Sequence, residues 1–353
     1  FLDLPAHPAG WASTFQIHHP EWFKRNDDGS FHSPGAWGVV WADLVELDYS
    51  RQELRDAIAD VFLFWCAKGV DGFRCDAGYM IPAELWKYVV DAVRKVFPDT
   101  VFLLEGLGGK LETTDELLSV SGLDWAYSEI FQQDNRDALS WYLPEAMVRS
   151  QEIGPLIHFA ETHDNNRLAA KGNGYAAMRT ALAALLSQQG AFGITAGVEW
   201  FCREKVDVHG APSLSWGSSE NQVALISRLN AILAYLPAFA IGAKLELITQ
   251  GGGNVLVAIR RAKTGEAVLI AINLDSDNPA TVEWDARHFP FGEAWDTISG
   301  RAILPHLQGE VSALNLAPGG FVALVASENT VREIEAFEAN RKGGNALDIP
   351  FRE

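Results

Sequence analysis

The order of apolar segments predicts an α/β protein, in which a (β/α)8 TIM-type barrel lacking about two N-terminal strands is followed by a C-terminal antiparallel β-sandwich. Up to residue 195, short apolar runs alternate with amphipathic helical segments, which is typical of βαβ units and a parallel sheet. From residue 244 to 327, apolar runs follow one another with glycine-rich turns between them. This second pattern is typical of an antiparallel β module.

The length of 353 residues is too great for one small domain, so one large domain and a smaller one are expected. We assign residues 1–240 to a partial catalytic barrel with a long loop insertion at about 6–50, residues 241–330 to an all-β domain and residues 331–353 to a tail. Six strand ends can be counted in the barrel segment, whereas a complete barrel has eight strands. An open barrel exposes strand edges, so we expect a dimer contact or an upstream segment to cover them.

The first barrel elements surround a long, irregular excursion. Residues 1–5 read as the end of a strand, and residues 6–50 are rich in Gly, Pro, His and Trp with little periodicity. Long loops of this kind in compact domains are usually functional. Residues 51–68 then place apolar side chains at helical spacing, with Ser50 as the expected N-cap and Gly69 as the expected terminator.

The remaining elements follow from the same patterns. An apolar strand ends at Asp76, and a helix over 82–96 has Pro82 in its first turn. Further barrel elements are strands at 101–104, about 123–128, 156–160 and 191–195, and helices near 134–149, 174–188 and 220–238. The β-sandwich includes strands at 255–259, 268–274 and 320–324, and a helix with a loose end is expected after residue 328.

Composition limits the classes of partner. The formal net charge of −18 argues against nucleic acid and anionic membrane surfaces and fits a neutral substrate. No run approaches the roughly 18 apolar residues that a membrane span needs, so no membrane partner is expected and a cytoplasmic location is favoured. Cys66, Cys75 and Cys202 show neither metal-ligand spacing nor a disulfide framework and are expected to be reduced core thiols. Because the chain begins with Phe1, the sequence does not show what precedes it.

The stretch Gly72-Phe73-Arg74-Cys75-Asp76 ends an apolar strand in an arginine and an aspartate two residues apart. Residues two apart on a strand point to the same face, so Arg74 and Asp76 are expected to project together from the carboxyl end, where α/β barrels carry their chemistry. The arginine favours the ionised carboxylate that a nucleophile must be. A surface ion pair at a strand end is the alternative.

Two later strand ends carry Glu105 and Asp164, so three carboxylates are expected to converge on one pocket. Together with Arg74 and His163, and without a Cys/His cluster for a transition metal, they suit glycosidic-bond chemistry. One carboxylate attacks the anomeric carbon, a second protonates the leaving oxygen, and a third stabilises positive charge in the transition state. Retention of configuration requires the first two carboxyl groups to lie about 5–5.5 Å apart.

These stretches resemble the α-amylase superfamily of glycoside hydrolases, family thirteen, which shows four short characteristic regions. Residues 72–77 resemble its second region, the strand ending in Glu105 its third, and residues 159–164 its fourth, while residues 3–11 resemble its first. Residues 41–49 resemble the stretch ahead of the family's third barrel helix. The resemblance covers nearly the whole chain, including the β-sandwich, and the order and spacing of the motifs make it specific.

The resemblance implies a substrate and a set of roles. The implied substrate is an α-glucan or maltooligosaccharide. The implied roles are nucleophile for Asp76, general acid/base for Glu105, transition-state stabiliser for Asp164, orientation of the nucleophile for Arg74, and sugar binding at the cleavage point for His163 and Asp3.

Two departures from the family pattern concern binding. The family's first region usually ends in Asn-His, of which the Asn often ligates a structural calcium and the His binds sugar, whereas this chain has His7 and Pro8. We therefore expect no required cofactor and assign no metal ligand, and a structural calcium stays open because its usual ligand is not evident. His7 either takes over part of these roles or makes a local hydrogen bond. Tyr79 replaces a Lys that reaches the acceptor side, and either stacks there or packs.

Three further residues are candidate sugar contacts. Trp11 lies in the long excursion and either stacks on a sugar ring or is buried against the barrel rim. Asn165 and Arg167 follow Asp164 and either bind sugar hydroxyls or cap the next helix.

The leading hypothesis is a retaining glycoside hydrolase that cleaves α-glucosidic bonds by double displacement. An α-glucan transglycosylase shares this mechanism, and the Asp76 and Glu105 stretches also resemble maltosyltransferases that extend glucans from maltose 1-phosphate. A phosphate donor favours a basic cluster, for which only scattered residues such as Lys110 are evident. A non-catalytic carbohydrate-binding relative or an inactive fragment is the alternative of another class, and the presence of Asp76, Glu105 and Asp164 argues against it.

Overall fold

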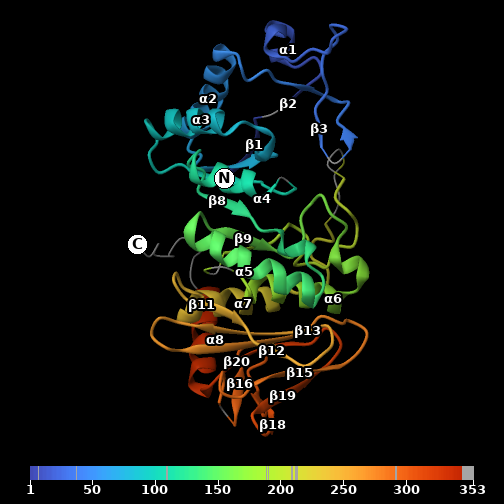
Figure 1. Ribbon diagram of the computed structural model, residues 1–353, viewed down its shortest axis with the longest axis vertical. Coiled ribbons are helices and arrows are strands. Elements are labelled where there is room, and N and C mark those ends of the chain that lie inside the picture. The colour runs from blue at the N-terminus through green and yellow to red at the C-terminus, as the bar shows by residue number, and fades with distance from the viewer. Residues whose placement is uncertain are drawn as a thin grey trace. The chain divides into compact units, whose positions relative to one another are not determined.

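The computed structural model describes residues 1–343 except residues 7, 37, 109, 188, 190, 208, 209, 211–213 and 291. The chain forms two compact units, whose elements are labelled in Figure 1. The first unit contains Phe1–Tyr127 and Glu152–Pro155, and the second contains Ser128–Gln151 and the chain from Leu156 onwards.

A parallel sheet forms the centre of the first unit. Its strands lie in the order β1 (Leu2–Pro5), β6 (Gly72–Asp76), β7 (Val101–Leu104) and β8 (Trp125–Tyr127). The helices α2 (Gln52–Ala67), α3 (Ala83–Arg94) and α4 (Leu111–Ser119) connect them. Neighbouring parallel strands need such crossover helices, so the alternation of strands and helices along the sequence produces this sheet.

Helix α2 packs on this sheet because its apolar residues recur every four positions. Leu54, Ile58 and Phe62 are buried in this way. The Phe62 ring lies 4.7 Å from that of Phe73 in β6 and 6.0 Å from that of Phe102 in β7, measured between centroids. Burying each such side chain contributes about 1.5–3 kcal/mol.

The excursion between β1 and α2 contains short elements that the sequence pattern did not reveal. Strand β2 (Pro8–Gly10) pairs antiparallel with β5 (Leu44–Glu46), and β3 (Gly35–Ala36) pairs with β4 (Val39–Val40). Helix α1 (Thr14–His18) and the 3-10 helix η1 (Pro20–Trp22) lie between β2 and β3.

The long helix α5 (Arg136–Glu152) lies near the start of the second unit. Its last residue, Glu152, is counted with the first unit. Strand β9 (Leu156–Phe159) pairs parallel with β10 (Phe192–Gly193). Helix α6 (Asn173–Leu185) joins them, and helix α7 (Val223–Tyr235) follows. Six parallel strands are thus present among the described residues.

The C-terminal part of the second unit is an antiparallel sandwich. Its larger sheet has the order β11 (Lys244–Leu247), β13 (Val255–Arg261), β14 (Ala267–Asn273), β20 (Phe321–Val325), β16 (Ala294–Asp296) and β17 (Ala302–Ile303). Its smaller sheet has the order β12 (Thr249–Gln250), β15 (Ala280–Asp285), β19 (Val311–Leu316) and β18 (His306–Gln308). Alternate residues such as Val257 and Trp284 fill the core between the sheets.

The predicted fold class is confirmed, namely parallel α/β structure of the barrel type followed by antiparallel sheets. A helix after residue 328 is also confirmed, as α8 (Glu328–Gly343). The three cysteines are buried free thiols, as expected. None of the helices in the described part of the chain is long and apolar enough to span a bilayer.

Three local predictions were wrong or incomplete. Helix α4 was not predicted, because its nine residues carry only a short apolar stripe. Arg51 occupies the N-cap of α2, since the Ser50 hydroxyl donates to Asp48 at 2.7 Å instead. Pro82 is the N-cap of α3 rather than a residue of its first turn.

Arg260 ties the parallel part of the second unit to the sandwich. It lies in β13, only 1% exposed, and donates from Nε to the Ala238 carbonyl at 2.9 Å and from Nη1 to the carbonyls of Leu185 and Ser187 at 3.2 and 2.7 Å. Leu185 ends α6, where a positive charge interacts favourably with the helix dipole. Burial lowers the pKa of Arg260 to about 9, so holding this charge inside the protein is costly.

We predict that Arg260→Met destabilises the second unit by about 2 kcal/mol, because buried carbonyls lose their donors. Urea unfolding followed by circular dichroism measures the change. Arg261→Met is the matched control, since the half-buried Arg261 donates to a single carbonyl, that of His288, and it should cost less than about 1 kcal/mol. Equal losses in the two variants would contradict the anchoring role.

Candidate active site

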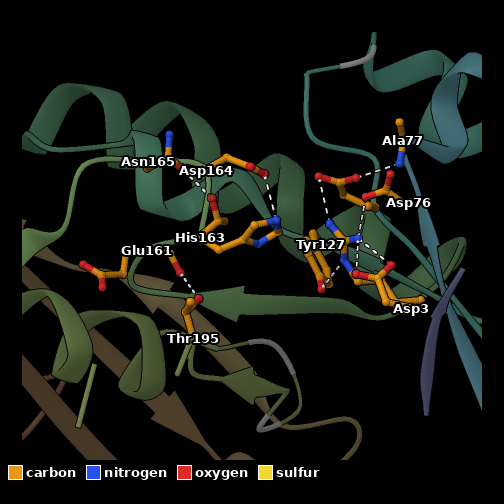
Figure 2. Close-up of polar contacts among 12 residues, drawn as sticks. Asp3, Asp76, Ala77, Tyr127, Glu161, His163, Asp164, Asn165 and Thr195 are labelled. Atoms are coloured by element: carbon orange, nitrogen blue, oxygen red, sulfur yellow. Dashed lines mark hydrogen bonds and ion pairs between the residues drawn. The ribbon is translucent and has the colours of Figure 1, made fainter. Parts of the chain in front are cut away.

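One arginine connects four strands of the first unit. Arg74 donates from Nη1 to both oxygens of Asp3 at 2.8 and 2.9 Å and to Asp76 Oδ1 at 2.6 Å. Its Nε donates to the Tyr127 hydroxyl at 3.1 Å. Its Nη2 lies 3.2 Å from Glu105 Oε1, within ion-pair distance but without hydrogen-bond geometry. Figure 2 shows this group of side chains around the guanidinium.

The strand register explains the convergence. Asp3 is the partner of Arg74 across β1 and β6, and Leu103 is its partner in β7. Glu105 directly follows β7, and its backbone N–H donates to the Cys75 carbonyl. The predicted pairing of Arg74 with Asp76 on one face is confirmed by their contact.

The charges of this group do not balance, because three carboxylates surround one guanidinium. Burial lowers the pKa of Arg74, but the negative charges of Glu105, Asp3 and Asp76 outweigh burial and raise it, so the guanidinium is always charged. Burial also raises the pKa of the Tyr127 phenol, and Arg74 opposes that rise. A negatively charged pocket is suited to a transition state with positive charge.

Glu105 is held by the backbone as well as by Arg74. Its side chain is buried, and Oε2 accepts a hydrogen bond from the Ala77 N–H at 2.7 Å. Ala77 follows β6 in a left-handed conformation, with φ of 40°. Both contacts fix the position of the carboxylate. Sequence reasoning missed Ala77 and Tyr127, because neither a backbone N–H nor a lone tyrosine after a weak strand has a recognisable pattern.

In the second unit, His163 and Asp164 lie in a loop after β9. His163 Nε2 is 3.4 Å from Asp164 Oδ2, and both side chains are accessible to solvent. The Thr162 hydroxyl donates to Asn165 Oδ1 at 2.5 Å, which braces the loop from within (Figure 2). The loop therefore presents His163 and Asp164 outward.

A buried ion pair closes this loop at its base. Arg167 Nε lies 2.5 Å from Glu161 Oε1, and both side chains are almost fully buried. Glu161 Oε2 also accepts from the Leu168 N–H at 2.5 Å, and Arg167 Nη2 donates to the Ala196 carbonyl at 3.0 Å. Burial raises the pKa of Glu161, against the opposing effects of Leu168 and Arg167.

Arg167 occupies the N-cap of the 3-10 helix η4 (Leu168–Lys171) without a side-chain capping hydrogen bond, and its burial corrects the expectation that it contacts sugar. The side chain has no exposed surface, and it holds Glu161 and the Ala196 carbonyl instead. The sequence analysis did not identify Glu161. The available signal was the presence of opposite charges, Glu161 and Arg167, on either side of the predicted site residues.

The remaining candidates have varied surroundings. Trp11 is 48% exposed and donates from Nε1 to the Ala42 carbonyl at 2.8 Å, so it is not buried against a rim. Tyr79 lies half-buried in the 3-10 helix η2 (Gly78–Met80). Asn165 is exposed. His7 lies outside the described residues.

The described residues contain no group of three or more His, Cys, Asp or Glu side chains arranged to hold a metal ion.

We predict that Arg74→Met lowers the unfolding free energy at pH 7 by about 3 kcal/mol, because three carboxylates are left facing one another without a cation. The loss should shrink at pH 4, where protonation of carboxylates relieves their repulsion. Urea unfolding at the two pH values gives the comparison. A loss that does not depend on pH would show that packing, and not charge, is the main contribution of Arg74.

No family model matches the chain. The chain is similar to alpha-1,4-glucan:maltose-1-phosphate maltosyltransferases of Picrophilus torridus (24% identity over 74% of this chain and 42% of that protein), Rhodospirillum rubrum (28%, 77% and 40%) and Cereibacter sphaeroides (26%, 85% and 48%). It spans less than half the length of these relatives.

Two crystal structures show the same fold. The α-amylase of Lactobacillus plantarum has a TM-score of 0.68 at 21% identity and covers 92% of this chain, which covers 77% of that enzyme. The α-amylase of Anoxybacillus has a TM-score of 0.72 at 18% identity, with coverages of 93% and 76%. In its motifs, sequence relatives and fold, the chain is similar to members of the α-amylase superfamily, glycoside hydrolase family thirteen.

Proposed function

We propose that the chain is the catalytic part of an α-glucan-active enzyme that works by double displacement, and that it transfers a maltosyl group from maltose 1-phosphate to a glucan. Hydrolysis was placed first from the sequence, with transfer as the alternative. The maltosyltransferase relatives favour the alternative. The α-amylase structures share too little sequence to support more than the fold.

The observation that carries the proposal is the cluster around Arg74. Asp76 is held against Nη1 of Arg74, a contact that suits a carboxylate nucleophile attacking the anomeric carbon. Glu105 binds the neighbouring Nη2 of the same guanidinium, which supports a short separation between the two carboxylates. Asp3 holds Arg74 in place from β1 and is available for sugar hydroxyls.

Glu105 is proposed as the general acid/base, with its side chain held by the Ala77 N–H beside Arg74. The same carboxyl group serves hydrolysis and transfer, so the two reactions differ in which acceptor reaches the glycosyl-enzyme.

In the first step, an Asp76 oxygen bonds to the anomeric carbon while the bond to phosphate breaks, and phosphate takes the electron pair and the proton of Glu105. A glucan hydroxyl then attacks the same carbon, its proton passes to Glu105, and the Asp76 ester bond breaks. Asp164 is proposed to stabilise the positive charge in both transition states, and His163 to bind the sugar.

We predict that phosphate is released from maltose 1-phosphate only when a maltooligosaccharide acceptor is present, and that the acceptor grows by two glucose units. Phosphate release and product lengths are measured together. New reducing ends formed from maltooligosaccharide alone would identify hydrolysis as the main reaction and overturn transfer. No turnover of either substrate by the folded chain would overturn both.

We predict that Asp76→Asn lowers turnover by at least about a thousandfold while the unfolding midpoint stays close to that of the original chain. The matched control is Asp91→Asn, which changes an exposed carboxylate paired with Lys87 on α3 and should leave turnover unchanged. Residual activity within tenfold in Asp76→Asn would remove the nucleophile assignment.

A further inference from the structure

Trp216 exposes more surface than any other tryptophan that the structure describes. It is 74% exposed, and its ring centroid lies 5.6 Å from that of Trp200, with the planes inclined by 50°. Both belong to the segment that follows β10 in the second unit. Unlike a singly exposed ring, which is common on protein surfaces, Trp216 is paired with a second indole and offers a larger aromatic surface to a ligand.

The backbone beside both tryptophans is strained. Leu214 and Ser215, which precede Trp216, both have φ of 53°, and Phe201, which follows Trp200, has φ of 50°. Each left-handed residue other than glycine costs roughly 1–2 kcal/mol. Strain of this kind persists where the surrounding structure imposes it, often at functional sites.

The same segment is fixed to the base of the loop that carries Asp164. The Thr195 hydroxyl donates to the Glu161 carbonyl at 2.8 Å, as Figure 2 shows, and Arg167 holds the Ala196 carbonyl. At Gly197, whose φ is +92°, an added Cβ would lie 3.0 Å from Arg167 Nη2 and 3.3 Å from Leu214 Cβ. Gly197 therefore packs closely against both Arg167 and Leu214 of the turn before Trp216.

We propose that Trp216, with Trp200 beside it, is a stacking platform for a glucose ring of an α-glucan, at a position away from the reacting bond. This rests on the proposed function. A pyranose ring presents C–H groups on its faces, and these pack on the flat indole surface without requiring charge. A neutral ligand also suits a chain with a net charge of −18. Because only a longer glucan reaches such a platform from the reacting bond, stacking there would favour longer glucans over shorter ones.

The test uses the Asp76→Asn chain, so that ligands are bound without turnover. Maltoheptaose and maltotriose are titrated calorimetrically into this chain and into the same chain carrying Trp216→Ala. We expect Trp216→Ala to weaken maltoheptaose binding about tenfold and maltotriose binding less than twofold. Trp141→Ala, which removes a 61% exposed tryptophan from α5, is the matched control and should change neither.

Trp216→Phe keeps an aromatic ring and should retain binding within about threefold, which separates stacking from a fault in folding. Unchanged maltoheptaose binding in Trp216→Ala, beside a parent chain that binds it, would overturn the platform and leave the proposed function standing. Equal weakening for both sugars would also overturn it. A parent chain that binds neither sugar would count against the proposed function itself.

Discussion

Charge compensation at Arg74 is the constraint on which the first unit depends. Three carboxylates lie against one guanidinium that is itself mostly buried, and without it they would repel one another. These carboxylates lie at the ends of three strands, because Asp3 is in β1, Asp76 ends β6 and Glu105 follows β7. Arg74 therefore holds the carboxyl ends of these strands together. Catalytic geometry and local stability therefore rest on the same side chain, and a change that harms one harms the other.

In the second unit, a buried ion pair between Glu161 and Arg167 holds the loop that carries Asp164. Asp164 lies on an exposed loop, which by itself would be a poor place for a group that must hold its position. The ion pair between Glu161 and Arg167 joins the two ends of that loop, and both side chains are almost fully buried. Breaking the pair would leave an unpaired charge inside the protein. The loop can therefore be exposed and still be positioned. We interpret both residues as positioning residues for Asp164.

Periodicity and strand alternation were enough to predict the β/α order and the pairing of Arg74 with Asp76, because both depend only on spacing along the chain. Contacts made by backbone groups were not predictable: the left-handed turn at Ala77 that places its N–H on Glu105 has no glycine to mark it. Arg167 was considered a sugar contact because it follows Asp164 closely, and its buried pairing with Glu161 has no signal in the spacing of the sequence. The short helix α4 was missed because nine residues carry too little pattern.

The negative charge of the site bears on which part of a phosphorylated donor is recognised. Carboxylates at the reacting carbon oppose the approach of a phosphate, so recognition must come mainly from the neutral sugar rings. A neutral glucan meets no such opposition. Under the proposed transfer, affinity for donor and acceptor alike therefore comes from contacts with sugar rings, which aromatic surfaces supply.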